Sequence, residues 1–212
     1  MTCHIFFTDI RLLADRFEQG CALLPATRQK RISRCKPETA RLQLLTAGLL
    51  LRKVLSITTD TQLLYTPSGK PYLQQGPCFN LSHSGNLAAL AVDNAPIGLD
   101  LQEMTKTFYS GVASRYFKAE EIAWMQDLPD RFFWLWTRKE SVIKSLGLGL
   151  SSLLTASFSV LEDNIAMNGT PLYLSSQILD RTTLSLASQS PLFSSPRLIS
   201  LSAEQLLDSA PI

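Results

Sequence analysis

Three short apolar segments separated by tight turns, near the middle of the chain, constrain the fold more than any other feature. Residues 79–84 and 87–92 predict two strands, and Ser84-Gly85-Asn86-Leu87 between them is typical of a hairpin turn. Asn94-Ala95-Pro96 predicts a second turn, after which residues 97–102 predict a third strand. We therefore expect an antiparallel meander in this part of the chain.

Helical segments lie on both sides of these strands. Residues 131–146 predict the clearest helix, because their apolar side chains recur at helical spacing on one face. Residues 25–54 predict two consecutive helical pieces, with Pro37 in the first turn of the second, where its missing N–H group is tolerated. A further helix is expected around residues 117–125. Three more strands and a short amphipathic segment are expected towards the carboxyl end, at residues 156–161, 171–175, 182–187 and 203–207.

The order of these elements runs from helical segments to a hairpin, and then again from helical segments to a hairpin. This order predicts an α+β fold of two pseudo-symmetric halves, each an antiparallel three-stranded sheet packed with helices. We expect an N-terminal half over residues 1–96 and a C-terminal half over residues 97–212. A chain of 212 residues is long enough for both halves.

Composition argues against several classes of protein. No stretch approaches the ~20 continuous apolar residues of a bilayer-spanning helix, and charged residues interrupt the N-terminal segment where a signal peptide has its apolar core. The four cysteines lack C-x-x-C spacing and the chain has only two histidines, which argues against a zinc site. We therefore expect a cytoplasmic protein with reduced thiols and no membrane partner.

A basic cluster occupies residues 28–53, where eight Lys or Arg residues accompany a single acidic residue, Glu38. Such a cluster is most often a solvated helix face, and it can also bind an anionic partner. A nucleic-acid-binding domain is the less favoured interpretation, because neither interleaved aromatic residues nor a recognisable module accompanies the charge. We therefore expect no nucleic-acid partner.

Two carboxylates are candidates for chemistry. Asp100 lies on the polar face of the strand at 97–102, and Glu140 flanks the apolar stripe of the helix at 131–146. Burying such charges costs several kcal/mol unless a cation or a hydrogen-bond network compensates. An ordinary salt-bridged pair and a Mg²⁺ site shared with substrate phosphates both fit. Lys144, one turn after Glu140, can pair with it or converge on the same ligand.

The pair Ser82 and His83 invites a second interpretation, a hydrolase with histidine as the base to a serine nucleophile. Adjacent residues of a strand point to opposite faces, so the two side chains are poorly placed to share a hydrogen bond. The chain also lacks a G-x-S-x-G nucleophile turn. The hydrolase interpretation is therefore not favoured.

Four ordered motifs join these residues into one pattern. They are Ser68-Gly69-Lys70-Pro71-Tyr72, Phe79-Asn80-Leu81-Ser82-His83-Ser84, Pro96-Ile97-Gly98-Leu99-Asp100 and Trp136-Thr137-Arg138-Lys139-Glu140-Ser141-Val142-Ile143-Lys144. In this order and spacing they resemble the signature of the Sfp-type 4′-phosphopantetheinyl transferases, over roughly residues 65–150. The last motif, with Gly147-Leu148-Gly149-Leu150 after it, is the most specific part of the resemblance.

The resemblance implies an enzyme of two pseudo-symmetric halves with coenzyme A as co-substrate in the cleft between them. Such an enzyme is a pseudo-dimeric monomer that transfers the phosphopantetheine arm to a serine of an apo acyl or peptidyl carrier protein, with release of 3′,5′-ADP. The resemblance also implies Mg²⁺ as the metal cofactor, with Mn²⁺ as the alternative ion.

The resemblance also implies roles for individual residues. Asp100 and Glu140 would bind the metal ion, Glu140 would also accept the serine proton, and Lys144 would stabilise charge on the phosphates. The residues implied to contact coenzyme A are Lys30, Arg34, Arg41, Lys70, Ser82 and His83.

Gln102 departs from the family pattern, which has Asp-x-Glu where this chain has Asp100-Leu101-Gln102. An amide oxygen can ligate Mg²⁺ but supplies no negative charge, so we expect Gln102 to bind the ion weakly, through water, or not at all. The departure keeps a second interpretation open, in which the chain is a non-catalytic module of the same fold that binds coenzyme A or a carrier protein.

Overall fold

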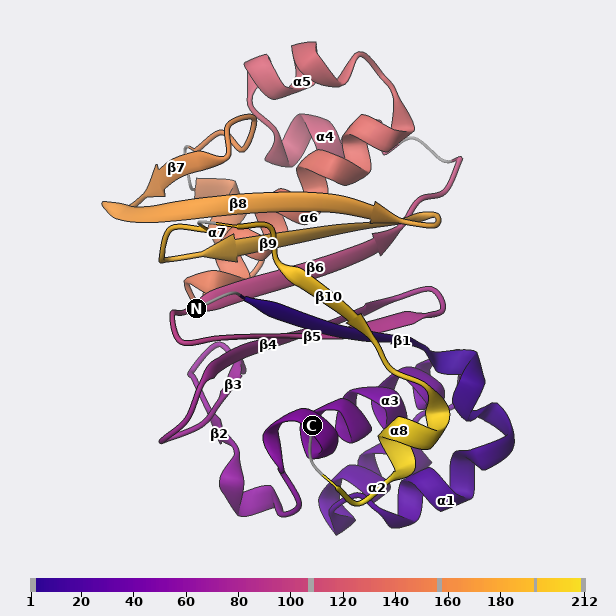
Figure 1. The fold of residues 1–212 in the computed structure, drawn as a ribbon. Helices are drawn as coiled ribbons and strands as arrows, with labels where there is room; N and C mark the ends of the chain where they lie inside the picture. The colour runs from indigo at the N-terminus through magenta and orange to yellow at the C-terminus, as the bar shows by residue number, and fades with distance from the viewer. Residues whose placement is uncertain (1–2, 107–108, 156–157, 193, 211–212) are drawn as a thin grey trace.

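The computed structural model describes residues 3–106, 109–155, 158–192 and 194–210. Two four-stranded sheets meet in the middle of the molecule, with helices at both ends (Figure 1). The first sheet has the order β10 (Arg197–Ser200), β1 (His4–Asp9), β5 (Leu87–Asp93) and β4 (Cys78–Ser84). The second has the order β6 (Ile97–Glu103), β9 (Thr182–Ser188), β8 (Thr170–Leu179) and β7 (Asn164–Met167). A small hairpin of β2 (Leu64–Tyr65) and β3 (Pro71–Tyr72) lies beside the first sheet.

The helices divide between the two sheets. Those beside the first sheet are α1 (Phe17–Ala22), α2 (Ala26–Arg34), α3 (Glu38–Leu55) and α8 (Ala203–Leu207), with two 3₁₀ turns, η1 (Ile10–Arg16) and η2 (Asp60–Gln62). Those beside the second sheet are α4 (Ser110–Tyr116), α5 (Ala119–Met125), α6 (Pro129–Ser145) and α7 (Ser152–Thr155). No described helix combines the length and the apolar character that a membrane span needs.

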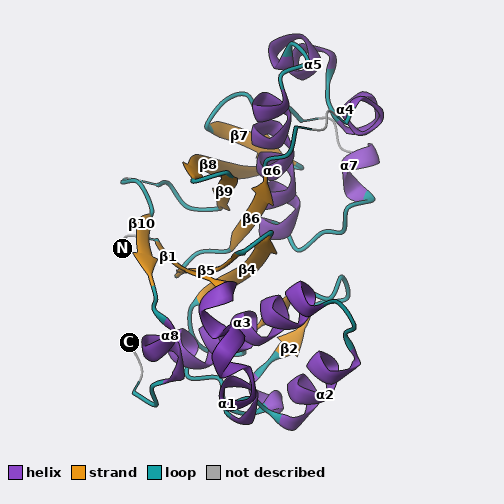
Figure 2. Ribbon diagram, turned by 90° about the vertical axis from the view of Figure 1, so that its right-hand side faces the viewer, coloured by secondary structure: helices purple, strands orange, loops and turns teal. Residues whose placement is uncertain are grey.

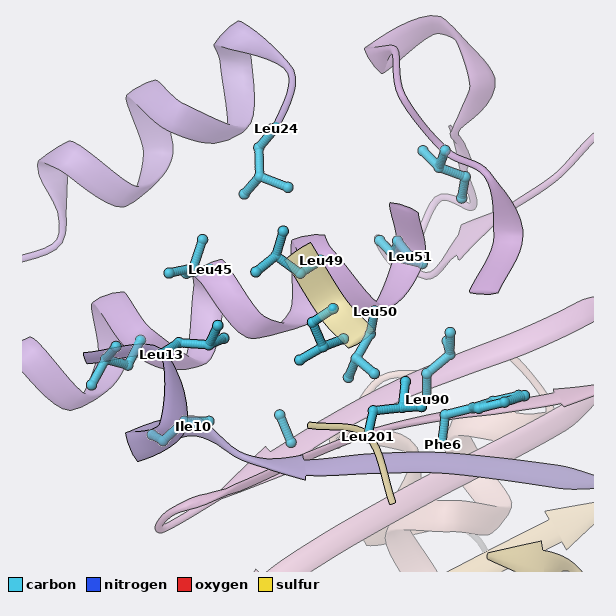
Figure 3. Packing of buried hydrophobic residues seen from close by; sticks show 14 of the residues in the cluster. Phe6, Ile10, Leu13, Leu24, Leu45, Leu49, Leu50, Leu51, Leu90 and Leu201 are labelled. Atoms are coloured by element: carbon cyan, nitrogen blue, oxygen red, sulfur yellow. The ribbon is translucent and has the colours of Figure 1, made fainter. Parts of the chain in front are cut away.

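The core of the first half forms where α3 crosses the sheet. Leu45, Leu49 and Leu50 are fully buried, and Figure 3 shows them between the neighbouring helices and the side chains of Phe6 and Leu90 on the strands. Each buried leucine contributes about 1.5–3 kcal/mol to the free energy of folding. This burial explains why α3 is apolar on most of its surface.

The α+β class is confirmed, and so is the pair of helical pieces, since α3 begins directly after Pro37. The three-stranded count is wrong, because each sheet has four strands. The first sheet is also not purely antiparallel, since β10 pairs with β1 in parallel. Thus β10 and α8 pack with the N-terminal elements although they follow residue 97. The boundary near residue 96 stays a prediction.

The predicted meander is divided between the two sheets. The antiparallel hairpin of β4 and β5 is confirmed, but β6 pairs with β9 instead of continuing the first sheet. Residues 158–161 are not a strand, and the backbone N–H of Val160 donates to the side chain of Glu121. Residues 156–157 of that predicted strand lie outside the described residues.

The two sheets meet where β4 runs beside β6. Side chains of β4 accept hydrogen bonds from backbone N–H groups of β6: Leu99 donates to Asn80 Oδ1, Leu101 to Ser82 Oγ and Glu103 to Ser84 Oγ, at 2.8, 3.1 and 2.9 Å. The constant offset of 19 residues shows that the strands run in the same direction. The side chains at alternate positions of β4 thus accept backbone N–H groups on the edge of β6 that faces β4, where no backbone hydrogen bonds between these two fully described strands are formed.

The helix α6 lies along β6 and β9 (Figure 2), and it carries the last of the four motifs. The confirmed helix begins at Pro129, whose missing N–H group is tolerated in the first turn. Gly98 of β6 permits a very close approach, because a Cβ atom there would lie 2.0 Å from Ser141 O and 2.3 Å from Ser145 N. The backbone of α6 therefore rests directly on β6.

Candidate active site at the junction of the two sheets

A cavity of about 440 Å³ opens where β4, β6 and α6 meet. Strand alternation places Asp100 and Gln102 on the same face of β6 as Gly98, and this face meets α6. One helical turn separates Glu140 from Lys144 on α6, so both reach the same space. The cavity brings together six of the predicted site residues: Ser82, His83, Asp100, Gln102, Glu140 and Lys144.

Lys144 joins the two carboxylates. Its ammonium donates to Asp100 Oδ1 at 2.5 Å and lies 3.6 Å from Glu140 Oε2. Ser82 donates from Oγ to the same oxygen of Asp100 at 3.1 Å, while that hydroxyl accepts the N–H group of Leu101. The hydroxyl proton of Ser82 is thus committed to Asp100, and this serine orients a carboxylate of the site.

The surroundings shift the proton affinities of these groups. Burial and the nearby charge of Asp100 raise the pKa of Glu140 to about 7. Burial also raises the pKa of Asp100, although Lys144 partly opposes this effect. Burial disfavours the charge of Lys144, but the carboxylates of Asp100 and Glu140 outweigh it and raise the pKa of that ammonium. Glu140 is therefore poised to take up or release a proton near neutral pH.

The oxygen atoms at this site suit a hard divalent cation. Asp100 is 4% exposed, and its Oδ2 atom is buried with no hydrogen-bond partner among the described residues. The carboxylate of Glu140 and the amide of Gln102 line the same cavity. The described part of the chain contains no group of three or more His, Cys, Asp or Glu side chains that could hold a metal ion. The set is thus two carboxylates and an amide, which fits Mg²⁺ when substrate phosphates complete the coordination.

Basic side chains enter the cavity from α2, but they are not the predicted ones. Arg28 and Arg31 line the cavity. Lys30 and Arg41 line a separate cavity of about 450 Å³ between α1, α2 and α3, and Arg34 lines neither. Residues three apart share a helix face, so the spacing of Arg28 and Arg31 is a sequence signal from which this pair could have been found.

His83 also faces this basic part of the cavity. Burial and the charges of Lys144 and Arg31 lower the pKa of its imidazole.

Lys70 does not line the cavity of the carboxylates. It lines a neighbouring cavity of about 280 Å³ with the end of α6, and its ammonium donates to backbone carbonyls. Burial lowers the pKa of Lys70 to about 8, so the ammonium form still predominates at pH 7.

Comparison with known proteins identifies relatives of this chain. Residues 96–185, which include β6 and α6, match the model of the 4′-phosphopantetheinyl transferase superfamily. The chain is 30% identical over 172 residues to the 4′-phosphopantetheinyl transferase Sfp of Bacillus subtilis, with 76% of each chain covered. It is 42% identical over 91 residues to the 4′-phosphopantetheinyl transferase psf-1 of Bacillus pumilus, covering 40% of this chain and 39% of that protein.

A third relative is the putative 4′-phosphopantetheinyl transferase slr0495 of Synechocystis, which is 34% identical over 146 residues. That match covers 61% of this chain and 59% of the relative. The chain therefore spans less than two thirds of the length of two of these three relatives, while its match to the third extends over about three quarters.

Proposed function

Because the chain belongs to the 4′-phosphopantetheinyl transferase superfamily, we propose that it transfers the phosphopantetheine arm of coenzyme A to a serine of an apo carrier protein. The by-product of this reaction is 3′,5′-ADP. The observation that carries the proposal is the group formed by Asp100, Lys144 and Glu140, which two motifs distant in sequence bring to one cavity.

The metal ion that this reaction requires is Mg²⁺. Asp100 and Glu140 are its proposed ligands, since one oxygen of Asp100 is buried without a partner among the described residues and the two carboxylates share the single ammonium of Lys144. Gln102 supplies an uncharged oxygen beside them. When bound, Mg²⁺ or Mn²⁺ neutralises negative charge on the pyrophosphate of coenzyme A.

Glu140 and Lys144 have different roles in the proposed transfer step. The serine oxygen of the carrier forms a bond to the phosphorus of the phosphopantetheine phosphate, and the bond from that phosphorus to the bridging oxygen breaks. The leaving group is 3′,5′-ADP, and Glu140 takes up the serine proton directly or through one water. The ammonium of Lys144 stabilises the charge that develops on the phosphate oxygens.

The nucleotide end of coenzyme A carries further negative charge. Arg28, Arg31 and His83 line the same cavity as the carboxylates, and we assign the phosphates of this end to them. Guanidinium groups bind phosphate oxygens in a bidentate manner, which suits the two arginines to this role. This assignment replaces Lys30, Arg34 and Arg41, which do not line the cavity of the carboxylates.

Mass spectrometry of the carrier tests the proposal. The protein is incubated with coenzyme A, Mg²⁺ and a panel of apo acyl and peptidyl carrier proteins. We expect one carrier or more to gain the mass of a phosphopantetheine group, and Glu140→Gln to abolish the gain. Glu38→Gln, which changes an exposed carboxylate at the start of α3, is the matched control and should act like the wild type. A panel with no mass gain in any carrier would contradict the enzyme assignment.

Gln102 supports one alternative, a non-catalytic module that binds coenzyme A or a carrier protein. The amide lowers the negative charge of the site by one relative to the family pattern. A module of this kind binds coenzyme A in calorimetry but modifies no carrier, and Gln102→Glu does not create activity. Transfer by the wild type excludes this alternative.

A further inference from the structure

The side chain of Lys70 binds the backbone of β6 and α6, the two elements that hold the site residues, and does not line the cavity of the site. Its ammonium donates to the backbone oxygens of Ile97, Lys144 and Ser145 at 2.8, 2.6 and 3.3 Å. An ammonium has three N–H donors, so all of them are used. Lys70 therefore has no free donor for a phosphate, which differs from the nucleotide contact expected from sequence.

The three acceptors belong to the two elements that hold the proposed reacting groups. Ile97 is the first residue of β6, three positions before Asp100. Lys144 and Ser145 are the last two residues of α6, about one turn after Glu140. Carbonyl groups at the end of a helix lack helical partners and form the negative end of its dipole, so a cation there is stabilising.

The turn that carries Lys70 is itself held in place. The N–H group of Thr66 donates to Lys70 O at 2.9 Å, and the N–H group of Lys70 donates to Thr66 Oγ1 at 3.0 Å. Gly69 has a φ of +87°, which glycine adopts without strain. Ser68 Oγ also donates to Gly147 O at 2.6 Å, so the turn is tied to the end of α6 at a second point.

The contact at Gly98 and the hydrogen bonds of Lys70 constrain α6 in different directions. Gly98 lets the two backbones touch, and this contact sets their separation. Hydrogen bonds from one ammonium join the end of α6 to the start of β6 and so oppose sliding of α6 along the strand, while Ser145 Oγ and Gln189 Nε2 add bonds to Pro96 O and Ser145 O. The 2.5 Å contact between Lys144 and Asp100 depends on that position.

We propose that Lys70 is a positioning residue that fixes α6 against β6 and so sets the distance between Asp100 and the pair Glu140 and Lys144. This inference rests on the proposed transfer reaction for its catalytic consequence, while its structural part stands on the hydrogen bonds alone. A displacement of about 1 Å in a catalytic group costs up to 100-fold in rate, so loss of the clamp reduces turnover more than binding.

The test compares Lys70→Met with three other variants. Arg31→Met removes a proposed nucleotide contact, Lys36→Met removes an exposed ammonium elsewhere, and Lys70→Arg keeps a cationic donor at the clamp. Calorimetry measures the Kd for 3′,5′-ADP, steady-state kinetics measures kcat and KM for coenzyme A, and hydrogen exchange follows the amides of residues 146–148 at the end of α6.

For Lys70→Met we expect kcat to fall about tenfold or more, with KM and the Kd for 3′,5′-ADP within about twofold of the wild type. Exchange of the amides at 146–148 should accelerate, Lys70→Arg should recover part of kcat, and Lys36→Met should match the wild type. Arg31→Met should instead weaken the binding of 3′,5′-ADP about tenfold.

Two results would overturn the proposal. A rise in the Kd for 3′,5′-ADP in Lys70→Met equal to that in Arg31→Met would make Lys70 a nucleotide contact. Unchanged exchange at 146–148 would show that Lys70 does not hold the end of α6. A wild-type protein that modifies no carrier contradicts the proposed function, and the exchange measurement still decides the clamp.

Discussion

Lys139 and Glu121 form an ion pair inside the second half of the molecule, and replacing Lys139 by methionine tests what that pair does. The Lys139 Nζ atom lies 2.9 Å from Glu121 Oε2, and the two residues are 2% and 0% exposed. Lys139 also donates to Phe158 O at 3.1 Å. Methionine keeps an unbranched apolar side chain in this space and removes the charge, so packing changes little.

The cost follows from what Glu121 retains. Removing one partner of a buried ion pair destabilises a protein by about 3–5 kcal/mol, because the other charge stays buried. Glu121 still accepts the N–H groups of Lys118 and Val160, each at 2.8 Å, so the lower part of this range applies. We expect Lys139→Met to lower the free energy of unfolding by about 3–4 kcal/mol, and Tm by about 6–16 °C.

Urea denaturation of a double-mutant cycle measures this effect. In the background of Glu121→Gln no carboxylate is left unpaired, so the cost of Lys139→Met should shrink by about 2 kcal/mol. A loss below about 1 kcal/mol in the single variant, or an equal loss in both backgrounds, would refute the reasoning.

Three further changes probe the site and its support. In metal-free solution Glu140→Gln should raise the free energy of unfolding by about 1–3 kcal/mol at pH 8 and hardly at pH 4. The reason is that the pKa of the Glu140 carboxyl is raised from 4.5 to about 7 in the folded protein. Its ionisation therefore lowers the free energy of unfolding as pH rises through that interval. Parallel pH profiles of the two proteins in urea denaturation would contradict this. Gln102→Glu should lower the Mg²⁺ concentration needed for half-maximal transfer, and an unchanged value would remove Gln102 from the surroundings of the ion. Gly98→Ala should lower the free energy of unfolding in urea by about 1–3 kcal/mol or more, since its Cβ atom would lie 2.0 Å from Ser141 O, and wild-type stability would show that α6 moves freely.

Local patterns predict the elements that depend on neighbours in sequence. The hairpin of β4 and β5 follows from its turn residues and apolar runs, and α6 follows from helical periodicity. Strand alternation also predicts that Asp100 leaves the apolar face of β6, and the structure shows that the face of Asp100 meets α6. Motifs and periodicity therefore predict the part of the cavity that β4, β6 and α6 line, and not the basic residues that α2 adds.

Long-range pairing is what the sequence does not show. β10 is missed because its partner, β1, lies at the other end of the chain, and β6 leaves the predicted meander because β9 offers it a ladder. Whether a segment forms a strand depends more on the neighbouring strands with which it packs than on its own residue types. Side chains follow the same rule: nothing local shows that Lys70 reaches the end of α6.

The basic residues of α2 depend on helical phase. The face with Lys30 and Arg34 and the face with Arg28 and Arg31 are equally basic in sequence. Packing of Ile32 and Leu24 into the core turns the second face towards the carboxylates. Only the tertiary contacts of α2 distinguish the two faces.

The stoichiometry of the reaction tests the central claim most directly. An apo carrier that accepts the phosphopantetheine group is incubated with the protein, coenzyme A and Mg²⁺, beside the same carrier with its acceptor serine changed to alanine. Chromatography measures 3′,5′-ADP while mass spectrometry measures the modified carrier. The account predicts one 3′,5′-ADP for each modified carrier and neither product with the alanine variant. Release of 3′,5′-ADP without modified carrier, or modification of the alanine variant, would contradict it.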